Sequence, residues 1–424
     1  MHMKKIIKKI ALLLIVFCIG VGVTLLYTNN KYGVYEKEET KQIKKHVDTI
    51  SMMLETEAKS GNYERTTRES WPTEGYVFNT TLSKCENGGE LLWDDEKKVV
   101  LMSGNVSDKC YVYFDVYVPP RFDEICDETT LACHVAKLYT GTQGENGIYY
   151  HDSSLTNGAG DSSYRYSGAN PNNYVCFGSN ESTCPIDNLY RIIGVFENNV
   201  KLIKYDYATS ALLGTDGNYQ ETGTPSASYY KGSLTTIDIY YWNNSTKKNT
   251  WSESLLNKTN LNTNFINNIG TEWANKIATT TWKVGGNTYA NISQVVPSVA
   301  YQNEIVNPVT TNTTDNAKEY SAKIGLMYVS DYGYAASSSA WTLTMNNYNS
   351  TTAKNLNWMH MGYYDWTLSR NADDSRYAFL VYYNGSVSSY SVNDDFAVRP
   401  SFNLESSITY ASGSGTQSDP IRIN

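Results

Sequence analysis

Hydrophobic positions concentrate first in one uninterrupted run near the N-terminus. Residues 10–27, IALLLIVFCIGVGVTLLY, contain no charged side chain, and this length is close to the lower limit for a helix that crosses a bilayer. Four lysines lie among residues 1–9, and basic residues favour the cytoplasmic side of a membrane. The pattern therefore predicts a cytoplasmic tail over 1–9, a single-pass transmembrane anchor over 10–27 and an extracellular body.

A cleaved signal peptide is the alternative reading of this run. Signal peptides usually have a shorter apolar core that ends at small residues, whereas YTNNKYG follows here. A lipoprotein would carry a small residue before its cysteine, and Phe17 precedes Cys18. An uncleaved signal-anchor in the cell membrane is the favoured prediction.

Beyond the anchor the apolar positions become periodic. Ile43, Val47, Ile50 and Leu54 recur at spacings of four, three and four among charged residues, which is typical of one face of a helix. We therefore predict a stalk helix within 28–61. It can form a short coiled coil, or it can pack on the domain that follows.

Short strands dominate the next segment. ELLWDDEKKVVLMSG reads as strand, charged turn and strand, and CYVYFDVYV is a further strand that ends at Pro119-Pro120. We predict a small all-β module over 72–119. Residues 120–187 are interpreted as a linking region, with one helix in DETTLACHVAKLYTG and a loop rich in Gly, Asn and Ser.

A large domain is predicted over 188–424. NLYRIIGVFENNVKLIKYDY is typical of a hairpin. SESLLNKTNLNTNFINNIG has near-helical spacing, with Ser252 as the expected N-cap and Gly270 as the stop. Two further strands are expected over 321–335 and 364–370.

The clearest local signal lies near the C-terminus. YAFLVYY is apolar on both faces, Asn384-Gly385 is a strong hairpin turn, and the return strand SVSSYSV has one polar face. The chain then re-enters a core in DDFAVRPSFNL, where Pro400 predicts a bulge or a break in strand pairing.

Six cysteines follow the anchor, and an even number outside a membrane favours disulfides. Zinc is the alternative, but no CxxC pair occurs, and His134 beside Cys133 is the only close His–Cys neighbour. Six cysteines allow 15 pairings, and proximity in sequence suggests the pairs 85–110, 126–133 and 176–184. The cysteines are Cys85, Cys110, Cys126, Cys133, Cys176 and Cys184.

Composition adds one feature and removes one class of partner. The 424 residues include 36 tyrosines and many Asn, Ser and Thr, a mixture that recognition surfaces favour and that exposed β-strands also favour. The net charge is −8 even with the N-terminal lysines included. Because nucleic-acid binding needs a basic surface, we predict no nucleic-acid partner.

Several segments together resemble a known family. NLYRIIGVF, IGLMYVSDYGYA, YDWTLSR, AFLVYYNGSV and AVRPSFNLES look like the C-terminal domain, of unassigned function, shared by many anchored surface proteins of Gram-positive bacteria. The resemblance covers about 140–424. That family is similar to C-type-lectin-like folds of the formylglycine-generating-enzyme and retroelement-variable-protein branch. It implies an α+β protein whose domain over 188–424 is C-type-lectin-like, with the anchor, stalk helix and disulfide-linked module before it.

The resemblance also implies a binding face, because relatives diversify the polar segments before the VRP strand for ligand binding. Trp366 and Arg399 are expected to be structural instead. The candidate ligand-binding residues are Tyr363, Tyr364, Asn371, Asp373, Asp374, Arg376, Tyr382, Tyr383, Ser388, Tyr390, Asn393 and Asp394.

Enzymatic chemistry finds little support in the sequence. Formylglycine-generating enzymes use cysteines in this domain, whereas the last cysteine here is Cys184, and no H-E-x-x-H, G-x-S-x-G or phosphate-binding glycine loop occurs. His360 is expected to be a packed or hydrogen-bonded side chain. Calcium is a minor hypothesis, since SVNDDF supplies oxygen ligands.

The predicted function is therefore an anchored extracellular binding protein, adhesin- or receptor-like, with a protein or glycan ligand. The alternative is a structural or assembly component of the cell envelope, in which the tyrosines make permanent protein contacts.

Overall fold

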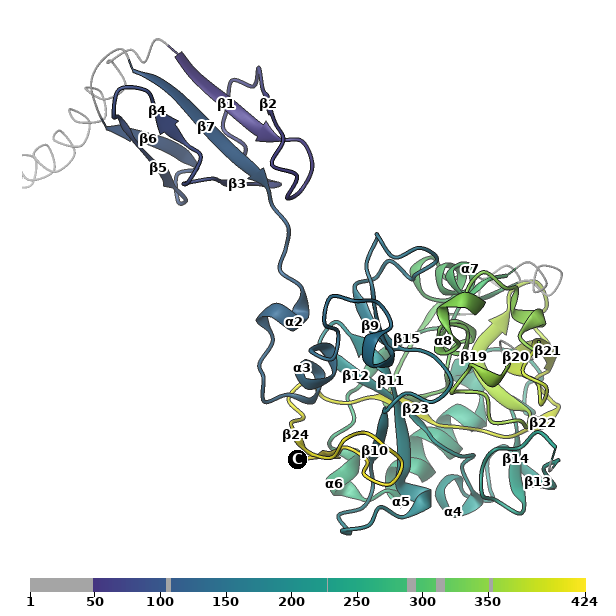
Figure 1. Ribbon diagram of the computed structural model, residues 1–424. Helices are drawn as coiled ribbons and strands as arrows, with labels where there is room; N and C mark the ends of the chain where they lie inside the picture. The colour runs from purple at the N-terminus through teal and green to yellow at the C-terminus, as the bar shows by residue number, and fades with distance from the viewer. Residues whose placement is uncertain (1–48, 104–107, 227, 288–294, 310–316, 351–353) are drawn as a thin grey trace, which may run out of the picture. The chain divides into compact units, whose positions relative to one another are not determined.

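The chain is described by a computed structural model that covers residues 49–103, 108–226, 228–287, 295–309, 317–350 and 354–424 (Figure 1). It divides into two compact units, with the boundary between Pro119 and Pro120. The predicted tail and anchor, and the first part of the predicted stalk, lie outside the described residues. Within the described ranges, no helix has both the length and the apolar character needed to cross a lipid bilayer.

The N-terminal unit is built from a five-stranded sheet in the order β2-β1-β7-β3, with β4 also paired to β7, and from the hairpin β5–β6. Its core gathers Met52, Phe78, Val112 and Phe114, with Trp93 packed edge-on against Phe114. The strands are β1 (Thr49–Glu55), β2 (Tyr63–Arg65), β3 (Tyr76–Phe78), β4 (Lys84–Cys85), β5 (Glu90–Asp94), β6 (Val99–Ser103) and β7 (Lys109–Val116).

The helix predicted over 28–61 is wrong for residues 49–55, which form β1 and pair in parallel with β7. Ile50 and Leu54 are four residues apart, and an even spacing suits one face of a strand as well as one face of a helix. Met52, which the helical reading ignored, lies on that same strand face and is buried opposite Val112. The module predicted over 72–119 therefore begins too late, because β1 lies between β2 and β7 in the sheet.

The C-terminal unit contains a seven-stranded sheet in the order β18-β23-β12-β11-β9-β8, with β10 also paired to β11. Residues 120–187 are not a linking region, since β8, β9 and β10 belong to this sheet, and the unit begins at Pro120 rather than 188. The strands are β8 (Ile148–His151), β9 (Ser163–Tyr166), β10 (Tyr174–Cys176), β11 (Leu189–Phe196), β12 (Asn199–Lys204), β18 (Ile324–Gly325) and β23 (Ser401–Asn403).

Smaller sheets complete this unit in the orders β16-β19-β20-β21, β13-β14-β22, β15-β17 and β24-β25. The predicted 188–207 hairpin, the 364–370 strand and the Asn384-Gly385 hairpin are confirmed. The strands are β13 (Tyr219–Gly223), β14 (Ile237–Tyr241), β15 (Thr280–Lys283), β16 (Gly286–Asn287), β17 (Glu319–Ala322), β19 (Asp365–Asn371), β20 (Tyr377–Val381), β21 (Val387–Ser391), β22 (Asp395–Phe396), β24 (Tyr410–Ser412) and β25 (Arg422–Ile423).

The helices are short. α8 lies beside β19 and β20 (Figure 1), although a strand was predicted over 321–335. All seven α8 residues are buried, including the polar Ser330 and Asp331, so its pattern of apolar and polar positions does not separate helix from strand. The α-helices are α2 (Phe122–Ile125), α3 (Leu131–Ala136), α4 (Ser210–Leu213), α5 (Ile266–Asn268), α6 (Thr271–Ala274), α7 (Pro297–Tyr301) and α8 (Val329–Ala335).

The helix predicted over 252–270 is confirmed in position but not in type. It comprises a 3₁₀ turn at Trp251–Glu253, a π-helix at Leu256–Phe265 and then α5, and Gly270 follows with φ of 82°. Ser254 rather than Ser252 caps its start, because Ser254 Oγ accepts a hydrogen bond from the Asn257 backbone N–H. A second π-helix spans Gln302–Val306. Further 3₁₀ turns lie at Glu145–Gly147, Ile186–Asn188, Ser338–Ala340 and Met345–Asn347.

The six cysteines from Cys85 to Cys184 all form disulfides. The bonds join Cys85 to Cys110, Cys126 to Cys133, and Cys176 to Cys184, as proximity in sequence suggested. Because each sulfur is oxidised and bonded, none of these cysteines is a zinc ligand.

Candidate ligand-binding surface

Five of the predicted tyrosines meet at one end of the β19–β20–β21 sheet. Asp365 pairs with Val381, so the residues just outside this pair, Tyr364 and Tyr382, become neighbours. Tyr390 lies on β21, on the same face of the sheet, because it pairs with Ala378. Strand register alone therefore gathers three segments that are separated in sequence.

Tyr364 is the centre of this tyrosine cluster, which we define as Tyr363, Tyr364, Tyr382, Tyr383 and Tyr390. Its ring centroid is 4.7 Å from that of Tyr382 and 5.5 Å from that of Tyr383. Tyr382 and Tyr390 stack at 6.0 Å. All five side chains are half-buried, so the cluster presents aromatic surface to solvent while its rings support one another.

Phe396 of β22 anchors the cluster to the core. It stacks on Tyr364 at 4.9 Å with an interplanar angle of 21°, and it meets Tyr390 at 5.3 Å. On its other side Phe396 contacts Trp366, which is fully buried and donates from Nε1 to the Tyr240 carbonyl oxygen. The structural role expected for Trp366 is confirmed.

The hydroxyl groups of the cluster influence one another. Burial raises the pKa of Tyr364, and its hydrogen bond with Tyr382 raises it further. Hydrogen bonds from Tyr364 and Tyr390 lower the pKa of Tyr382, since they stabilise its phenolate.

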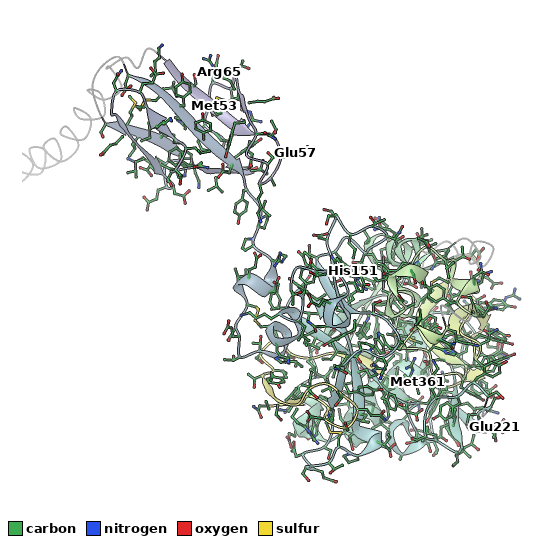
Figure 2. All side chains as sticks on the ribbon, in the orientation of Figure 1. Met53, Glu57, Arg65, His151, Glu221 and Met361 are labelled. Carbon is green, nitrogen blue, oxygen red and sulfur yellow. A yellow bond between two sulfur atoms is a disulfide. The ribbon has the colours of Figure 1, made fainter. Side chains whose placement is uncertain are left out.

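Further tyrosines extend the cluster, and no pattern in the sequence pointed to them. Tyr229 lies 5.0 Å from Tyr383 and is 37% exposed. The backbone of Tyr229 passes so close to Gly362 that a Cβ atom at Gly362 would lie 1.8 Å from the Tyr229 carbonyl oxygen. Beneath Tyr363, Tyr207 packs with Met361, which Figure 2 labels inside the unit. The doublet Tyr229-Tyr230 can be read in the sequence. Its contact with residues more than 130 positions later could not be predicted from the sequence.

His360 supports the cluster from inside. Its Nε2 lies 3.0 Å from the Tyr383 carbonyl oxygen, and burial, aided by Lys231, lowers the pKa of His360 to about 3. A neutral imidazole that donates to a backbone carbonyl fits the packed role expected from the sequence.

The base of the cluster is an ion pair. Arg399 Nε donates to Asp365 Oδ2 at 2.6 Å, and both side chains are 2% exposed. Burial raises the pKa of Asp365 to about 6, although Arg399 opposes this change. The structural role expected for Arg399 is confirmed.

Four other candidates lie at the opposite end of the β19–β20 hairpin. Asn371 is 3% exposed, and its Oδ1 accepts from the backbone N–H groups of Asp373 and Asp374. Arg376 pairs with Asp374 at 2.8 Å. These residues build the turn between the strands, and they do not join the tyrosine cluster.

The remaining candidates flank Tyr390. Ser388 is half-buried on β21, opposite Leu380. In the turn before β22, Asn393 Oδ1 accepts from Ser391 Oγ at 2.5 Å and Asp394 Oδ2 accepts from the Ser391 N–H. Their oxygens close the turn, so calcium gains no support here. In the part of the chain that the structure describes, the only potential metal group is Cys85, Asp108 and Cys110, and its cysteines form a disulfide.

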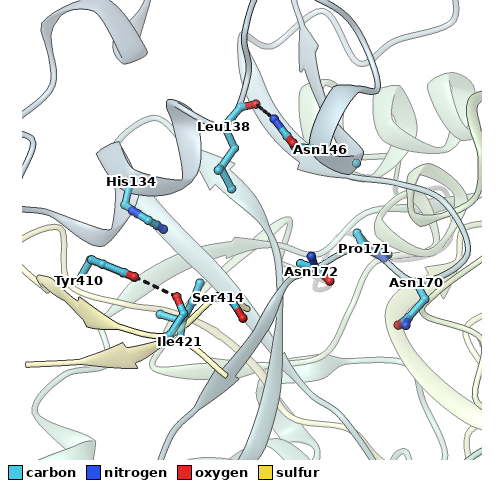
Figure 3. Close-up of a pocket in the computed structure, with 11 residues that line it drawn as sticks. His134, Leu138, Asn146, Asn170, Pro171, Asn172, Tyr410, Ser414 and Ile421 are labelled. Carbon is cyan, nitrogen blue, oxygen red and sulfur yellow. Dashed lines mark hydrogen bonds between the residues drawn. The ribbon is translucent and has the colours of Figure 1, made fainter. Parts of the chain in front are cut away.

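A separate pocket of about 440 Å³ lies beside the C-terminal hairpin (Figure 3). His134 stacks on Tyr410 with centroids 3.7 Å apart, and burial lowers the pKa of His134. Asn146 and Asn172 contribute amides to the lining. Neither Asp nor Glu lines it, so the pocket offers hydrogen bonding without a pair of acid and base groups.

Comparisons of the chain with protein-family models, with curated proteins and with solved structures found no match. The resemblance to a C-type-lectin-like domain therefore stays a prediction from the sequence, and the argument for function depends on the geometry of the tyrosine cluster.

Proposed function

We propose that the chain is a membrane-anchored extracellular binding protein. Its C-terminal unit presents the tyrosine cluster, flanked by Ser388, Asn393 and Asp394, on a C-type-lectin-like scaffold. The observation that carries this proposal is the convergence of five tyrosines from three segments on one half-exposed surface. Tyrosine suits recognition because it offers a large, rigid contact area together with a hydroxyl group.

The base of the cluster supports the same proposal. Trp366 and the Asp365–Arg399 pair are buried in the core, and Phe396 packs against it, so the exposed rings rest on rigid elements. A preorganised surface loses little conformational entropy on binding. Ligand contact with two or three of these rings is expected to supply most of the affinity.

A binding screen tests this function. The full-length chain, purified in mild detergent and labelled, is applied to glycan and cell-surface protein arrays with and without a chelator. The test variants are Tyr383→Ser and Tyr229→Ser, which alter the outer rings. The matched control is Tyr117→Ser, because Tyr117 is 50% exposed and lies in the N-terminal unit.

We expect at least one ligand whose affinity falls about five- to thirty-fold in each cluster variant, as for an aromatic residue that dominates an interface. The Tyr117→Ser protein keeps its affinity. A ligand that binds all three variants equally would show that the cluster is not the binding surface.

A second candidate, an assembly role in the envelope, is favoured by one feature of the N-terminal unit. Leu92 and Leu101 are paired across the β5–β6 hairpin and are 64% and 39% exposed. Exposed apolar pairs of this kind are typical of protein contacts. Chemical cross-linking of the wild type and of the Leu92→Ser variant on cells separates this role from ligand binding.

A further inference from the structure

A cleft of about 680 Å³ opens in the C-terminal unit and shares no residue with the tyrosine cluster. It is lined by Lys201 of β12, by β15 and by Asp331 of α8, with the β11–β12 turn at its edge. This volume lies within the range of small-molecule binding sites.

An ion pair lies in the cleft wall. Lys201 Nζ donates to Asp331 Oδ2 at 2.6 Å, and the two side chains are 6% and 1% exposed. Asp331 is held in place because Oδ2 also accepts from the Tyr328 backbone N–H at 2.8 Å. The Lys201 ammonium lies 4.5 Å from the centroid of the Tyr328 ring and 5.4 Å from that of Trp282. Charged hydrogen-bonding groups and aromatic surface therefore meet at one place.

This pair has hydrogen-bonding capacity left over. Among the described residues, Asp331 Oδ1 has no hydrogen-bond partner, and neither has Arg165 Nη1, which lies 3.9 Å from it. An ammonium carries three donors, and Asp331 takes one of those of Lys201. Asp331 Oδ1 and Arg165 Nη1 are themselves fully buried, and Arg165 does not line the cleft. The hydrogen-bonding capacity offered to a ligand is therefore that of the Lys201 ammonium and of the polar side chains in the lining.

Charge decides which ligands fit. Lys201 is paired with Asp331, Arg165 with Asp161, and Lys283 with Glu319, so the interior offers no uncompensated charge to an ion. At the mouth, Glu197 and Glu405 are exposed and, within the described residues, take part in no ion pair. These two carboxylates repel anions. A neutral ligand is favoured.

The rest of the lining matches a ligand that is rich in hydroxyl groups. Four aromatic residues offer apolar faces, and seven hydroxyl or amide side chains offer donors and acceptors. The aromatic residues are Phe196, Trp282, Tyr301 and Tyr328, and the polar ones are Ser163, Asn199, Thr279, Thr280, Thr281, Asn403 and Ser406. We propose that this cleft binds a neutral saccharide, and that it does so without a metal ion.

The test uses the full-length chain in detergent with EDTA and three neutral trisaccharides: maltotriose, cellotriose and tri-N-acetylchitotriose. Sialyllactose is the anionic comparison. Saturation-transfer NMR detects weak binding, and titration calorimetry measures it. Thr281→Arg places a long side chain at the mouth from an exposed position of β15. Thr222→Arg is the matched control, because Thr222 is an exposed threonine on β13, outside the cleft lining.

We expect at least one neutral trisaccharide to bind, with affinity lowered about tenfold or more, 1.4 kcal/mol, by Thr281→Arg and unchanged by Thr222→Arg. Absence of binding by all three neutral sugars, preference for sialyllactose, or loss of binding in EDTA would overturn the proposal. Binding that Tyr383→Ser abolishes and Thr281→Arg leaves intact would also overturn it, while supporting the tyrosine cluster as the binding surface. The two proposals therefore fail independently.

Discussion

Removal of the Arg399 charge is the sharpest test of how the tyrosine cluster is held. Asp365 begins β19 directly after Tyr364, and it also forms a bridge with Ala397, the residue after Phe396. The Asp365–Arg399 ion pair therefore joins the two segments that carry the central ring and its anchor. Arg399→Met deletes the charge and keeps an unbranched apolar stem, so it isolates the electrostatic contribution.

The expected cost follows from the geometry. At the 2.6 Å separation of Nε and Oδ2, the attraction is about 6 kcal/mol at an effective dielectric constant of about 20, before the desolvation of both charges is subtracted. A buried charge that loses its partner costs about 3–5 kcal/mol. Protonation limits this cost, because Asp365 already has a pKa of about 6 beside Arg399, and holding it neutral in the variant requires only the free energy between that pKa and the ambient pH. That limit is about 1.4 kcal/mol at pH 7 and close to zero at pH 5.

The assay is urea unfolding followed by tryptophan fluorescence at pH 7 and pH 5. Trp71 and Trp93 are the only tryptophans before Pro119, and the other seven lie in the C-terminal unit, so the signal reports mainly on that unit. We expect Arg399→Met to lower the free energy of unfolding by about 1.4 kcal/mol at pH 7 and by almost nothing at pH 5, where Asp365 is already largely protonated in the wild type. The control is the double variant Arg399→Met/Asp365→Asn, which removes both charges and is expected to recover much of the loss. A loss that is as large at pH 5 as at pH 7 would refute this reasoning.

Three further outcomes are expected. Gly385→Ala should destabilise the β20–β21 hairpin by more than about 1 kcal/mol, because φ is +96° and the new Cβ atom would lie 2.9 Å from the Tyr348 carbonyl oxygen. Thermal unfolding checks this, with Gly75→Ala as the control at a positive φ with no close neighbour. Cys85→Ser/Cys110→Ser should cost the N-terminal unit about 3 kcal/mol by releasing a 25-residue loop, and hydrogen exchange of β7 measures it. Burial raises the pKa of Glu304 from 4.5 to about 7, so the native state binds this proton more tightly than the unfolded state, and stability falls as pH rises from about 4.5 to 7. In Glu304→Gln, the fall in the free energy of unfolding between pH 4.5 and 7 should be smaller by about 3 kcal/mol. An unchanged fall would contradict the raised pKa of Glu304.

Local signals in the sequence predicted local structure well. The Asn384-Gly385 turn predicted a hairpin whose register places Val381 opposite Val387, and the charged turn after Phe196 did the same for β11 and β12. The disulfide pairs were also predictable, since each bond joins two cysteines that are consecutive along the chain. Such features depend on residues within about 25 positions of one another, so the chain encodes them directly.

Several features were undetermined until distant segments met. Residues 49–55 fit a helix and a strand equally, and parallel pairing with β7, some 60 positions later, decides for the strand. The strands of 148–176 resembled loop because their polar residues are buried by other parts of the sheet. Every residue of α8 is buried, so its apolar and polar positions show neither the period of a helix nor that of a strand.

The two candidate sites show the same division. The family resemblance supplied the five tyrosines of the tyrosine cluster as candidates, and the Asn384-Gly385 hairpin turn indicated that two of the three segments that carry them lie on neighbouring strands. The cleft could not be predicted from the sequence. Lys201 and Asp331 are 130 positions apart, and in its local sequence each resembles an ordinary surface charge. The alternation of apolar and polar positions and the residue preferences of turns act over a few residues, so the sequence alone determines them. Which charged groups share one buried space depends on how sheets and helices pack, and only the tertiary structure decided that.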